Sequence, residues 1–295
     1  MSDFYRAFED RFRGSREMIK ARLRVYLPFV TPLAAEGRPC KAFDVGCGRG
    51  EWLEVLREAG IEARGIDLDA GMLAACHELG LAVETGEAVA GLAALPAESQ
   101  DIVSGFHLAE HLRFADLQAL VQQALRVLRP GGLLILETPN PENLSVGTTH
   151  FYLDPTHVRP IPPLLLEFLP AHYGFHRVKI VRLQEAPGMA DNAAPGLVNV
   201  LRDASGDFAV VAQKAGPAAR LAALDPAFGK EYGVTATELA ARYDAALEAR
   251  LKAAEANAQQ AAARVEQLLE SRSWRLTAPL RWVADAISGT RKAGR

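Results

Sequence analysis

A glycine-rich turn directly after a short apolar run is the feature that most constrains this chain: Phe43-Asp-Val-Gly-Cys-Gly-Arg-Gly-Glu51. The apolar run predicts a buried strand, and residues 50–59 carry apolar side chains at helical spacing. Gly46, Gly48 and Gly50 allow the backbone to turn sharply and to approach a ligand without an intervening Cβ atom. Amides at the start of a helix favour a carboxylate or a phosphate. The stretch therefore predicts a strand–turn–helix unit that binds an anionic group.

A second signal lies at the end of the next expected strand, where Asp67 follows Arg64-Gly-Ile66. Asp67 stands behind Asp44 at close to the roughly 20-residue spacing at which a carboxylate reaches a ribose hydroxyl in dinucleotide-binding folds. The glycine spacing, however, is G-x-G-x-G and not the dinucleotide pattern G-x-G-x-x-G. A purely structural corner of an α/β domain has the same kind of turn. Because both signals occur in register, we favour a cofactor site that includes the glycines, Asp44 and Asp67.

Composition limits the class of protein but not its function. The chain has 295 residues, of which 49% are hydrophobic and 23% charged, as in soluble globular proteins. The net charge of −3 gives no basic field, so we expect no nucleic-acid partner. Three cysteines without a C-x-x-C pair predict neither disulfides nor a zinc knuckle, and they suit a reducing cytoplasm. Because long apolar runs are lacking, we expect neither a signal peptide nor a membrane span.

From residue 41 onward, strands and helices alternate, which predicts a parallel sheet covered by helices on both faces. The strands are expected at 41–46, 62–67, 81–85, 101–106, 133–138, 176–183 and 207–213, and the helices at 50–59, 70–79, 114–128 and 163–172. Asp116 is expected to cap a helix, Arg129-Pro-Gly-Gly132 to form a turn, and the last strand to lie antiparallel at the sheet edge. Ligands bind at the carboxyl ends of such strands. We assign the cofactor domain to residues 41–214.

Residues 1–40 predict a helical lid made of two helices. Three phenylalanines spaced four residues apart give the first helix an apolar stripe, and Ser15 can cap the second. The region is rich in arginine, which for most of these residues indicates only a solvated helix face. Arg13 and Arg16 flank the break between the helices, and we expect these two to reach an anionic group of the substrate.

Past a linker at residues 215–234, the composition changes to alanine, glutamate, glutamine, arginine and leucine. Residues 235–272 contain neither glycine nor proline and predict one long helix. Its apolar positions alternate between steps of four and three residues, which is the pattern of a coiled coil: Leu247, Leu251, Ala254, Ala258, Ala261, Val265 and Leu268. We therefore expect a homo-oligomer with a weak, alanine-rich seam. A helix docked on its own domain is the alternative.

The tail, residues 273–295, is basic and amphipathic. Pro279 can start a helix, one face of which carries Leu280, Val283 and Ile287. Tryptophan and arginine beside such a stripe suit a helix that lies on an anionic membrane surface, here the inner membrane. A contact with a partner protein, or packing within a dimer, explains the same pattern.

The segment after the fourth expected strand, Phe106-His-Leu-Ala-Glu-His111, holds the first candidate bases. Histidine is the usual base near neutral pH, and this segment opens onto the cofactor cleft. His107 can instead line the cofactor, and His111 can simply begin a helix. We assign His107 to cofactor binding and His111 to catalysis.

The second group of candidates lies at residues 150–160, after the fifth expected strand. Such a density of functional side chains on an irregular segment at the ligand end of a sheet indicates a site, although a proline-stiffened, aromatic-packed loop has the same composition. We assign His157 and Asp154 to catalysis. Acceptor binding is assigned to His150, Tyr152 and Arg159. Histidines and carboxylates of both segments can bind a divalent ion, but no spacing selects a ligand set, so we predict no metal.

Together these motifs resemble the class I S-adenosylmethionine (SAM) methyltransferases of the broad ubiquinone-biosynthesis-like group. The resemblance spans residues 40–214 and rests on Asp44–Gly50, Asp67, Ala109–Leu112 and Arg129–Gly132. It implies a Rossmann-like sheet of seven strands and SAM as the cofactor. Asp67 would bind the ribose hydroxyls, and Leu68 would pack on the adenine. Glu87 and Ala88 would contact the adenine edge.

Further stretches are similar to the methyltransferase half of the bacterial O-antigen chain terminator, a kinase–methyltransferase with a C-terminal coiled coil: Phe8–Arg16, Arg24–Pro28 and Leu153–Pro160. The tail Ser271–Arg281 resembles the ends of polysaccharide-assembly enzymes. This resemblance implies O-methylation at the terminus of a surface polysaccharide, O-antigen or capsule, in lipopolysaccharide biosynthesis. It also implies a cytoplasmic protein at the inner membrane with a glycosyltransferase partner. Because the helical extension follows the methyltransferase region without a kinase between them, we expect direct methylation of a terminal sugar.

The acceptor decides which residues carry the chemistry. A sugar hydroxyl is a poor nucleophile and benefits from a base such as His157 or His111. A phosphate is already anionic and needs positioning by Arg13, Arg16 and Arg159. Two alternatives stay open, a small-molecule or quinone-type O-methyltransferase and an inactive SAM-binding scaffold for a glycosyltransferase. Some ubiquinone O-methyltransferases carry a glutamate in place of the first histidine of the His-Leu-Ala-Glu-His segment, and this chain departs from them there.

Overall fold

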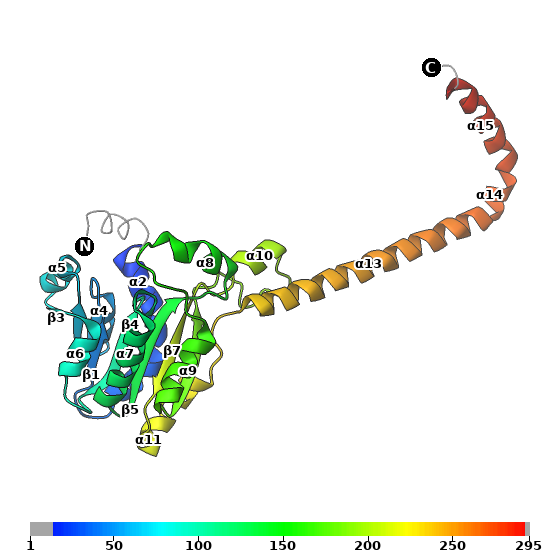
Figure 1. The fold of residues 1–295 in the computed structure, drawn as a ribbon. Coiled ribbons are helices and arrows are strands. Elements are labelled where there is room, and N and C mark those ends of the chain that lie inside the picture. The colour runs from blue at the N-terminus through cyan, green and yellow to red at the C-terminus, as the bar shows by residue number, and fades with distance from the viewer. Residues whose placement is uncertain (1–13, 293–295) are drawn as a thin grey trace. The chain divides into compact units, whose positions relative to one another are not determined.

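Figure 1 shows the computed structural model, which describes the backbone of residues 14–292 and the side chains of residues 14–284, 286 and 287. The chain divides into two compact units, residues 1–240 and 241–295. The expected phenylalanine stripe of the first helix and Arg13 lie outside the described residues. The first unit contains the sheet and every candidate site residue that is described.

A seven-stranded sheet forms the centre of the described part of the first unit, as predicted. Its strands are β1 (Lys41–Val45), β2 (Glu62–Asp67), β3 (Ala82–Thr85), β4 (Gln100–Phe106), β5 (Leu128–Pro139), β6 (Arg177–Leu183) and β7 (Asp207–Gln213). They lie in the order β3-β2-β1-β4-β5-β7-β6. β7 is antiparallel, as expected, but it lies between β5 and β6 and not at the edge. The chain order reverses between β1 and β4, and ligands bind at such switch points.

The start of β5 differs from the prediction, because Arg129-Pro-Gly-Gly132 continues the strand instead of forming a turn. Leu128 pairs with Gln100, and the register then shifts before the regular pairing with β4 begins. The extra residues are thus absorbed as an irregularity at the entrance of the strand, as in a β-bulge. Glycine and proline indicate a break in regular structure, but they do not distinguish a turn from a bulge.

Helices cover both faces of the sheet (Figure 1). One core cluster joins the sheet to α6 (Ala88–Ala94), α7 (Phe114–Val127) and α9 (Pro163–Tyr173). The other joins it to α2 (Arg16–Leu23), α3 (Leu27–Ala34), α4 (Glu51–Glu58) and α12 (Asp225–Gly229). A smaller cluster holds α5 (Ala70–Glu78) against α4. Both faces are therefore buried, and ligands have access at the strand ends.

The described part of the N-terminal region packs into the core of the first unit. Ser15 caps α2 as predicted, because its side chain accepts a hydrogen bond from the Met18 amide. A 3-10 helix, η1 (Arg24–Tyr26), leads into α3, and both Tyr26 and Phe29 are fully buried. Burial of one such large side chain contributes about 1.5–3 kcal/mol. This layer therefore cannot swing away from the sheet without exposing part of the core.

Several short helices lie where the sequence predicted none: α6, η2 (Ala109–His111), α8 (Leu144–Thr148), η3 (His150–Leu153), α10 (Leu197–Arg202), α11 (Ala218–Ala222) and α12. The last two lie within residues 215–234, which were expected to be a linker. Helices this short show too few periodic positions to be recognised. The expected cap of α7 was also wrong. Arg113 is the N-cap, and Asp116 forms an ion pair with it at 2.7 Å.

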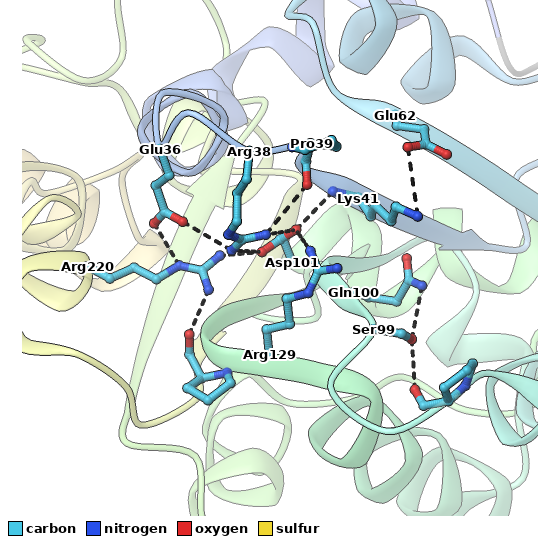
Figure 2. Close-up of polar contacts among 12 residues, drawn as sticks. Glu36, Arg38, Pro39, Lys41, Glu62, Ser99, Gln100, Asp101, Arg129 and Arg220 are labelled. Atoms are coloured by element: carbon cyan, nitrogen blue, oxygen red, sulfur yellow. Dashed lines mark hydrogen bonds and ion pairs between the residues drawn. The ribbon is translucent and has the colours of Figure 1, made fainter.

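At the amino-terminal ends of the strands, a buried carboxylate fastens the segment after the sheet to the domain (Figure 2). Asp101, at the start of β4, is fully buried and is bound by Arg38, Arg129 and Arg220. The Lys41 amide donates a further hydrogen bond to it at 2.9 Å. Desolvation raises the pKa of Asp101, but the hydrogen bonds outweigh it and lower the pKa to about 2. Because Arg220 belongs to α11, the network ties this helix to β4.

The long helix predicted for residues 235–272 is α13 (Ala236–Glu270), and α14 (Arg272–Leu276) and α15 (Ala278–Lys292) follow it. The leucines and the valine of the expected coiled-coil seam are exposed. Association through this seam stays a prediction. Within residues 14–292, no helix combines the length and the apolar character needed to cross a membrane.

Candidate active site

The turn between β1 and α4 has the backbone shape of an anion-binding loop. Gly46, Gly48 and Gly50 have φ values of 68°, 51° and 79°, a region that residues with a Cβ rarely adopt. A Cβ at position 46 would lie 3.2 Å from Leu108 Cδ1. The Gly50 amide donates to the Cys47 carbonyl at 2.9 Å, and Gly50 is the N-cap of α4. The predicted strand–turn–helix unit is thus present.

Asp67, the last residue of β2, lies beside this turn. Its Oδ2 accepts a hydrogen bond from the Gly48 amide and its Oδ1 one from the Asp69 amide, both at 2.8 Å. The two bonds orient the carboxylate, and each oxygen keeps a second lone pair for another donor, such as a hydroxyl. Leu68, the next residue, is 70% exposed and offers an apolar surface at the same strand end.

Three other residues predicted to bind the cofactor are engaged within the protein. Asp44 is buried and accepts a hydrogen bond from Ser104 Oγ at 2.6 Å, so it joins β1 to β4 beneath the turn. Glu87 caps α6 by accepting hydrogen bonds from two amides of that helix. Ala88 is buried. These residues shape the walls of the site, and their direct contact with a cofactor stays a prediction.

Arg16, predicted to bind the substrate, lies against the glycine turn. Its Nη1 donates to the Arg49 carbonyl at 2.9 Å, and its Nε donates to Glu54. Its Nη2 is buried and has no hydrogen-bond partner among the described residues. A buried polar atom without a partner costs about 1–3 kcal/mol, and a carboxylate bound at the turn would satisfy it. Arg16 thus lies beside the glycine turn, and its predicted role in substrate binding stays a prediction.

His107 follows β4 with a φ of 50°, a strained conformation for a residue with a Cβ. Its side chain is 47% exposed and lies between two carboxylates. Nδ1 is 3.3 Å from Glu110 Oε1, and Nε2 is 3.3 Å from Glu137 Oε1. Desolvation lowers the pKa of His107, but the ion pairs with Glu110 and Glu137 outweigh it and hold the pKa well above its ordinary value. A histidine that stays protonated is not the base.

Two residues that the sequence did not single out complete this cluster. Tyr26 is fully buried and donates from its hydroxyl to Glu137. Asp207, the first residue of β7, lies with His107 and Glu137 in a group whose ligand atoms are within 4.8 Å of one another. Desolvation, together with the negative charge of Glu137, raises the pKa of Asp207 to about 6 against the opposing charge of His107. Only Glu137 carried a sequence signal, because it ends a run of buried apolar residues.

The loop at residues 150–160 returns to the end of β4. The Val158 amide donates to the Glu110 carbonyl at 2.8 Å. His111 Nδ1 lies 2.9 Å from Thr156 Oγ1, and the Thr156 hydroxyl donates to Asp154 at 2.7 Å. Because that hydroxyl proton is already used, the His111 Nδ1–H donates to Thr156 and leaves Nε2 with a lone pair. The structure thus brings together the three predicted catalytic residues, His111 from one segment and Asp154 and His157 from the other.

His157 is oriented by a similar contact. Its Nδ1 lies 2.6 Å from the Phe151 carbonyl, which only accepts, so Nδ1 carries a proton, and its Nε2 lies 3.9 Å from Asp154 Oδ2. The ring centroids of His157 and His111 are 4.7 Å apart. Desolvation lowers the pKa of His111, so that imidazole is neutral at pH 7. Asp154 has a lowered pKa, because hydrogen bonds from Thr156 outweigh its desolvation.

The remaining predicted acceptor residues form the outer side of this loop. His150, Tyr152 and Arg159 are exposed, Tyr152 to 65%. The Arg159 guanidinium lies over the Phe114 ring at 4.4 Å, which orients its donors. These side chains stand on the same loop as His157 and are free to meet an acceptor, so their predicted role stays a proposal.

Comparison with known proteins assigns the family. The family described as "Methyltransferase domain" matches residues 43–136. A SAM-dependent methyltransferase from Archaeoglobus fulgidus, known from its crystal structure, is 33% identical with a TM-score of 0.63, and the match covers 72% of this chain and 100% of that one. The chain belongs to the class I SAM-dependent methyltransferases.

Curated relatives of this methyltransferase match it over shorter stretches. A probable S-adenosylmethionine-dependent methyltransferase of Mycolicibacterium smegmatis is 28% identical over 148 residues, which is 50% of this chain and 56% of the relative. A ubiquinone biosynthesis O-methyltransferase of Methylococcus capsulatus is 37% identical over 108 residues, 34% of this chain and 44% of that one. The chain thus spans about half the length of the curated relatives it matches.

The residues at the strand ends of this methyltransferase fit SAM. The glycine turn and the unsatisfied Nη2 of Arg16 suit its carboxylate, the free lone pairs of Asp67 suit the ribose hydroxyls, and Leu68 suits the adenine. When bound, SAM supplies an activated methyl group on a sulfonium. The protein has to place the acceptor in line and, where the acceptor is a hydroxyl, to remove its proton.

Proposed function

We propose that this methyltransferase methylates a hydroxyl oxygen of a sugar at the terminus of a surface polysaccharide. The observation that carries the proposal is the loop at residues 150–160, which places the imidazole of His157 beside that of His111 and carries exposed polar and aromatic side chains beside the strand ends. Sites for small molecules enclose most of their ligand, whereas the end of a polymer can be bound on an open surface. The similarity of Leu153–Pro160 to the O-antigen chain terminator supports the same acceptor.

The chemistry assigned to the chain is the activation of the acceptor. SAM, when bound, would supply the methyl group, and the acceptor hydroxyl would have to lose its proton as its oxygen is methylated. His111 and His157 lie at this place, and we assign them the removal of that proton. Asp154 acts through Thr156, which fixes the tautomer of His111.

The helices of the second unit support a location beside polysaccharide-assembly enzymes. In α13, Leu251, Val265 and Leu268 are exposed and form one seam that a second copy of the chain would cover. In the tail, the Arg281 guanidinium lies over the Trp274 ring at 3.7 Å, and neighbouring apolar side chains are exposed. A surface of this kind suits the inner face of an anionic membrane or a glycosyltransferase partner.

A quinone-type O-methyltransferase is the second candidate, because the relative from Methylococcus capsulatus carries that name. The test offers the purified protein labelled SAM with two acceptors in parallel, a polysaccharide with a free non-reducing end and a catechol quinone precursor. We expect label in the polysaccharide. Transfer to the catechol alone would reverse the choice, and SAM binding without transfer to either acceptor would favour the inactive scaffold.

His157→Asn examines the assigned chemistry. The variant should bind SAM as the wild type does, because the loop does not contribute to the glycine turn. Turnover on the sugar acceptor should fall by about 10²–10⁴-fold, the usual contribution of proton transfer. His172→Asn, on the surface of α9, is the matched control. A wild-type rate in the His157 variant would remove this residue from the mechanism.

A further inference from the structure

Glu110, His111 and His157 converge at the end of β4 although they come from two separate segments. Each residue offers one atom that can bind a metal ion, and these atoms all lie within 4.8 Å of one another. Glu110 is fully buried, whereas His111 and His157 are partly exposed. The convergence depends on the return of the 150–160 loop, which the Val158–Glu110 backbone hydrogen bond fixes.

The Glu110 carboxylate is only half satisfied within the protein. Its Oε2 accepts a hydrogen bond from the Thr138 hydroxyl at 2.9 Å. Its Oε1 is buried and accepts no hydrogen bond from any residue that the structure describes. The His107 imidazole lies 3.3 Å away, as an ion pair without hydrogen-bond geometry. The protonated His107 thus compensates part of the charge, and a bound metal ion would give Oε1 the direct partner that it lacks.

The two imidazoles already have the arrangement that metal-binding histidines show. Each donates its Nδ1–H to an oxygen of the protein, His111 to Thr156 and His157 to Phe151. Such outer contacts use Nδ1 and fix the ring orientation, which leaves Nε2 as the atom that can bind an ion; Nε2 of His157 also lies 3.9 Å from Asp154 Oδ2. Thr156 is itself held by Asp154, so the outer contact of His111 has its own support.

We propose that Glu110, His111 and His157 bind a divalent transition-metal ion, with Zn²⁺ as the best fit. Two imidazoles and one carboxylate suit Zn²⁺, whereas Mg²⁺ and Ca²⁺ prefer oxygen ligands. Three protein ligands leave a position for water or for an acceptor oxygen. The site differs from the sequence-based expectation of no metal. It rests on these contacts alone and holds whichever acceptor the enzyme uses.

The ion would change what the two histidines do in the proposed function, and this consequence rests on that function. A hydroxyl bound to Zn²⁺ loses its proton far more readily than a free one. His111 and His157 would then hold the ion, and the proton would pass to solvent or to a nearby carboxylate. Catalysis on a sugar would consequently stop when the ion is removed.

The first test measures metal content directly. The full chain without a polyhistidine tag is stripped with a chelator, dialysed against Zn²⁺ and analysed by atomic emission. We expect about one ion per chain in the wild type and in the His172→Asn control, and loss of the ion in His111→Asn and in His157→Asn. A wild type that retains no ion, or histidine variants that bind like the wild type, would overturn the proposal.

The second test probes the outer contact and does not depend on turnover. Thr156→Val removes the acceptor of the His111 Nδ1–H and should weaken Zn²⁺ binding about 10–100-fold, while circular dichroism stays unchanged. Co²⁺ in place of Zn²⁺ should give visible d–d bands that His157→Asn alters. Unchanged affinity in the threonine variant and unchanged bands would both count against the site. SAM binding is measured in parallel, since its failure would contradict the proposed function without touching the ion site.

Discussion

The two ends of β4 each bury a carboxylate completely, and the difference between them separates stability from function. Asp101, at the amino end, accepts hydrogen bonds from arginine side chains and a backbone amide (Figure 2). Glu110, just past the carboxyl end, has one oxygen that accepts no hydrogen bond from the described residues. Burial is the same in both cases, so burial alone does not mark a site. The two carboxylates differ in how fully their oxygens are hydrogen-bonded.

The same contrast appears in the protonation of the two ends. At the amino end, excess positive charge lowers the pKa of Asp101 to about 2. At the carboxyl end, desolvation and the charge of Glu137 raise the pKa of Asp207 to about 6, and His107 is strained at a φ of 50°. Groups with shifted pKa values and strained backbone gather where a protein binds and reacts. At the amino end, Glu98 also has a positive φ of 52°, so the contrast lies in the charges, because Asp101 forms ion pairs with three arginines.

The largest expected effect is on stability at the amino end. Asp101→Asn leaves Arg38, Arg129 and Arg220 without their buried counter-charge, and such a loss costs about 3–5 kcal/mol. Because the native pKa of about 2 lies below the ordinary 3.8, the wild-type contribution is present above pH 4 and is lost as the pH falls through 2. Urea denaturation at pH 7 and at pH 3 measures it.

Glu36→Gln is the matched control for that measurement, because Glu36 binds Arg220 at the partly exposed rim of the same network. Glu36→Gln should lower the free energy of unfolding clearly less than Asp101→Asn does. Equal losses of unfolding free energy in the two variants would show that the buried Asp101 carboxylate contributes no more to stability than the partly exposed Glu36. Impaired SAM binding in folded Asp101→Asn protein would contradict the view that the amino end of β4 serves stability and the carboxyl end serves function.

The second-largest expected effect is on SAM affinity at the carboxyl ends of the strands. Asp67→Ala removes a carboxylate that holds the Gly48 amide and that we expect to bind the ribose hydroxyls. Hydrogen bonds to a charged group contribute about 1.5–3 kcal/mol each, so SAM affinity should fall at least about 10-fold in calorimetry. Asp69→Ala, which removes the cap of α5, serves as the control. An Asp67 variant with wild-type affinity would withdraw the ribose assignment.

The smallest effect is the pH dependence that Asp207 introduces. Its native pKa of about 6 lies above the ordinary 3.8, so the native state binds this proton more tightly than the unfolded state does. Stability from this group is therefore present below pH 4 and is lost as the pH rises to 6. Asp207→Asn should flatten that slope by on the order of 1 kcal/mol. Thermal melts at pH 4.5 and pH 7 that show the wild-type slope in the variant would contradict the shift.

The fold was predictable because its signals are local. Apolar strands, amphipathic helices and the positive-φ glycines are each encoded within a few neighbouring residues, and their alternation leaves few topologies. The turn at Gly46 to Gly50 and the cap at Ser15 were confirmed for this reason. The turn expected at Arg129–Gly132 was wrong, because a bulge in β5 depends on pairing with β4, which lies elsewhere in the sequence.

The site was predictable only as a set of candidates. His111, Asp154 and His157 could be selected, but their hydrogen bonds, and hence their tautomers, depend on how the loop returns to β4. Tyr26 gave no signal, since an isolated tyrosine in a helix is usually part of the core. The contact of Arg16 with the glycine turn could not be predicted, because it is fixed only when α2 packs on α4.

Tyr26 and Arg220 set limits on how this catalytic unit can be moved between proteins. The hydroxyl of Tyr26 reaches Glu137 from a layer that precedes β1, and Arg220 reaches Asp101 from a helix that follows β7. A fragment cut at residues 41–214 would contain every sequence motif of the family and would lack both contacts. Recombination that preserves the enzyme must therefore transfer the flanking segments together with the sheet. The segment that has to be exchanged is longer than the segment that carries the family motifs.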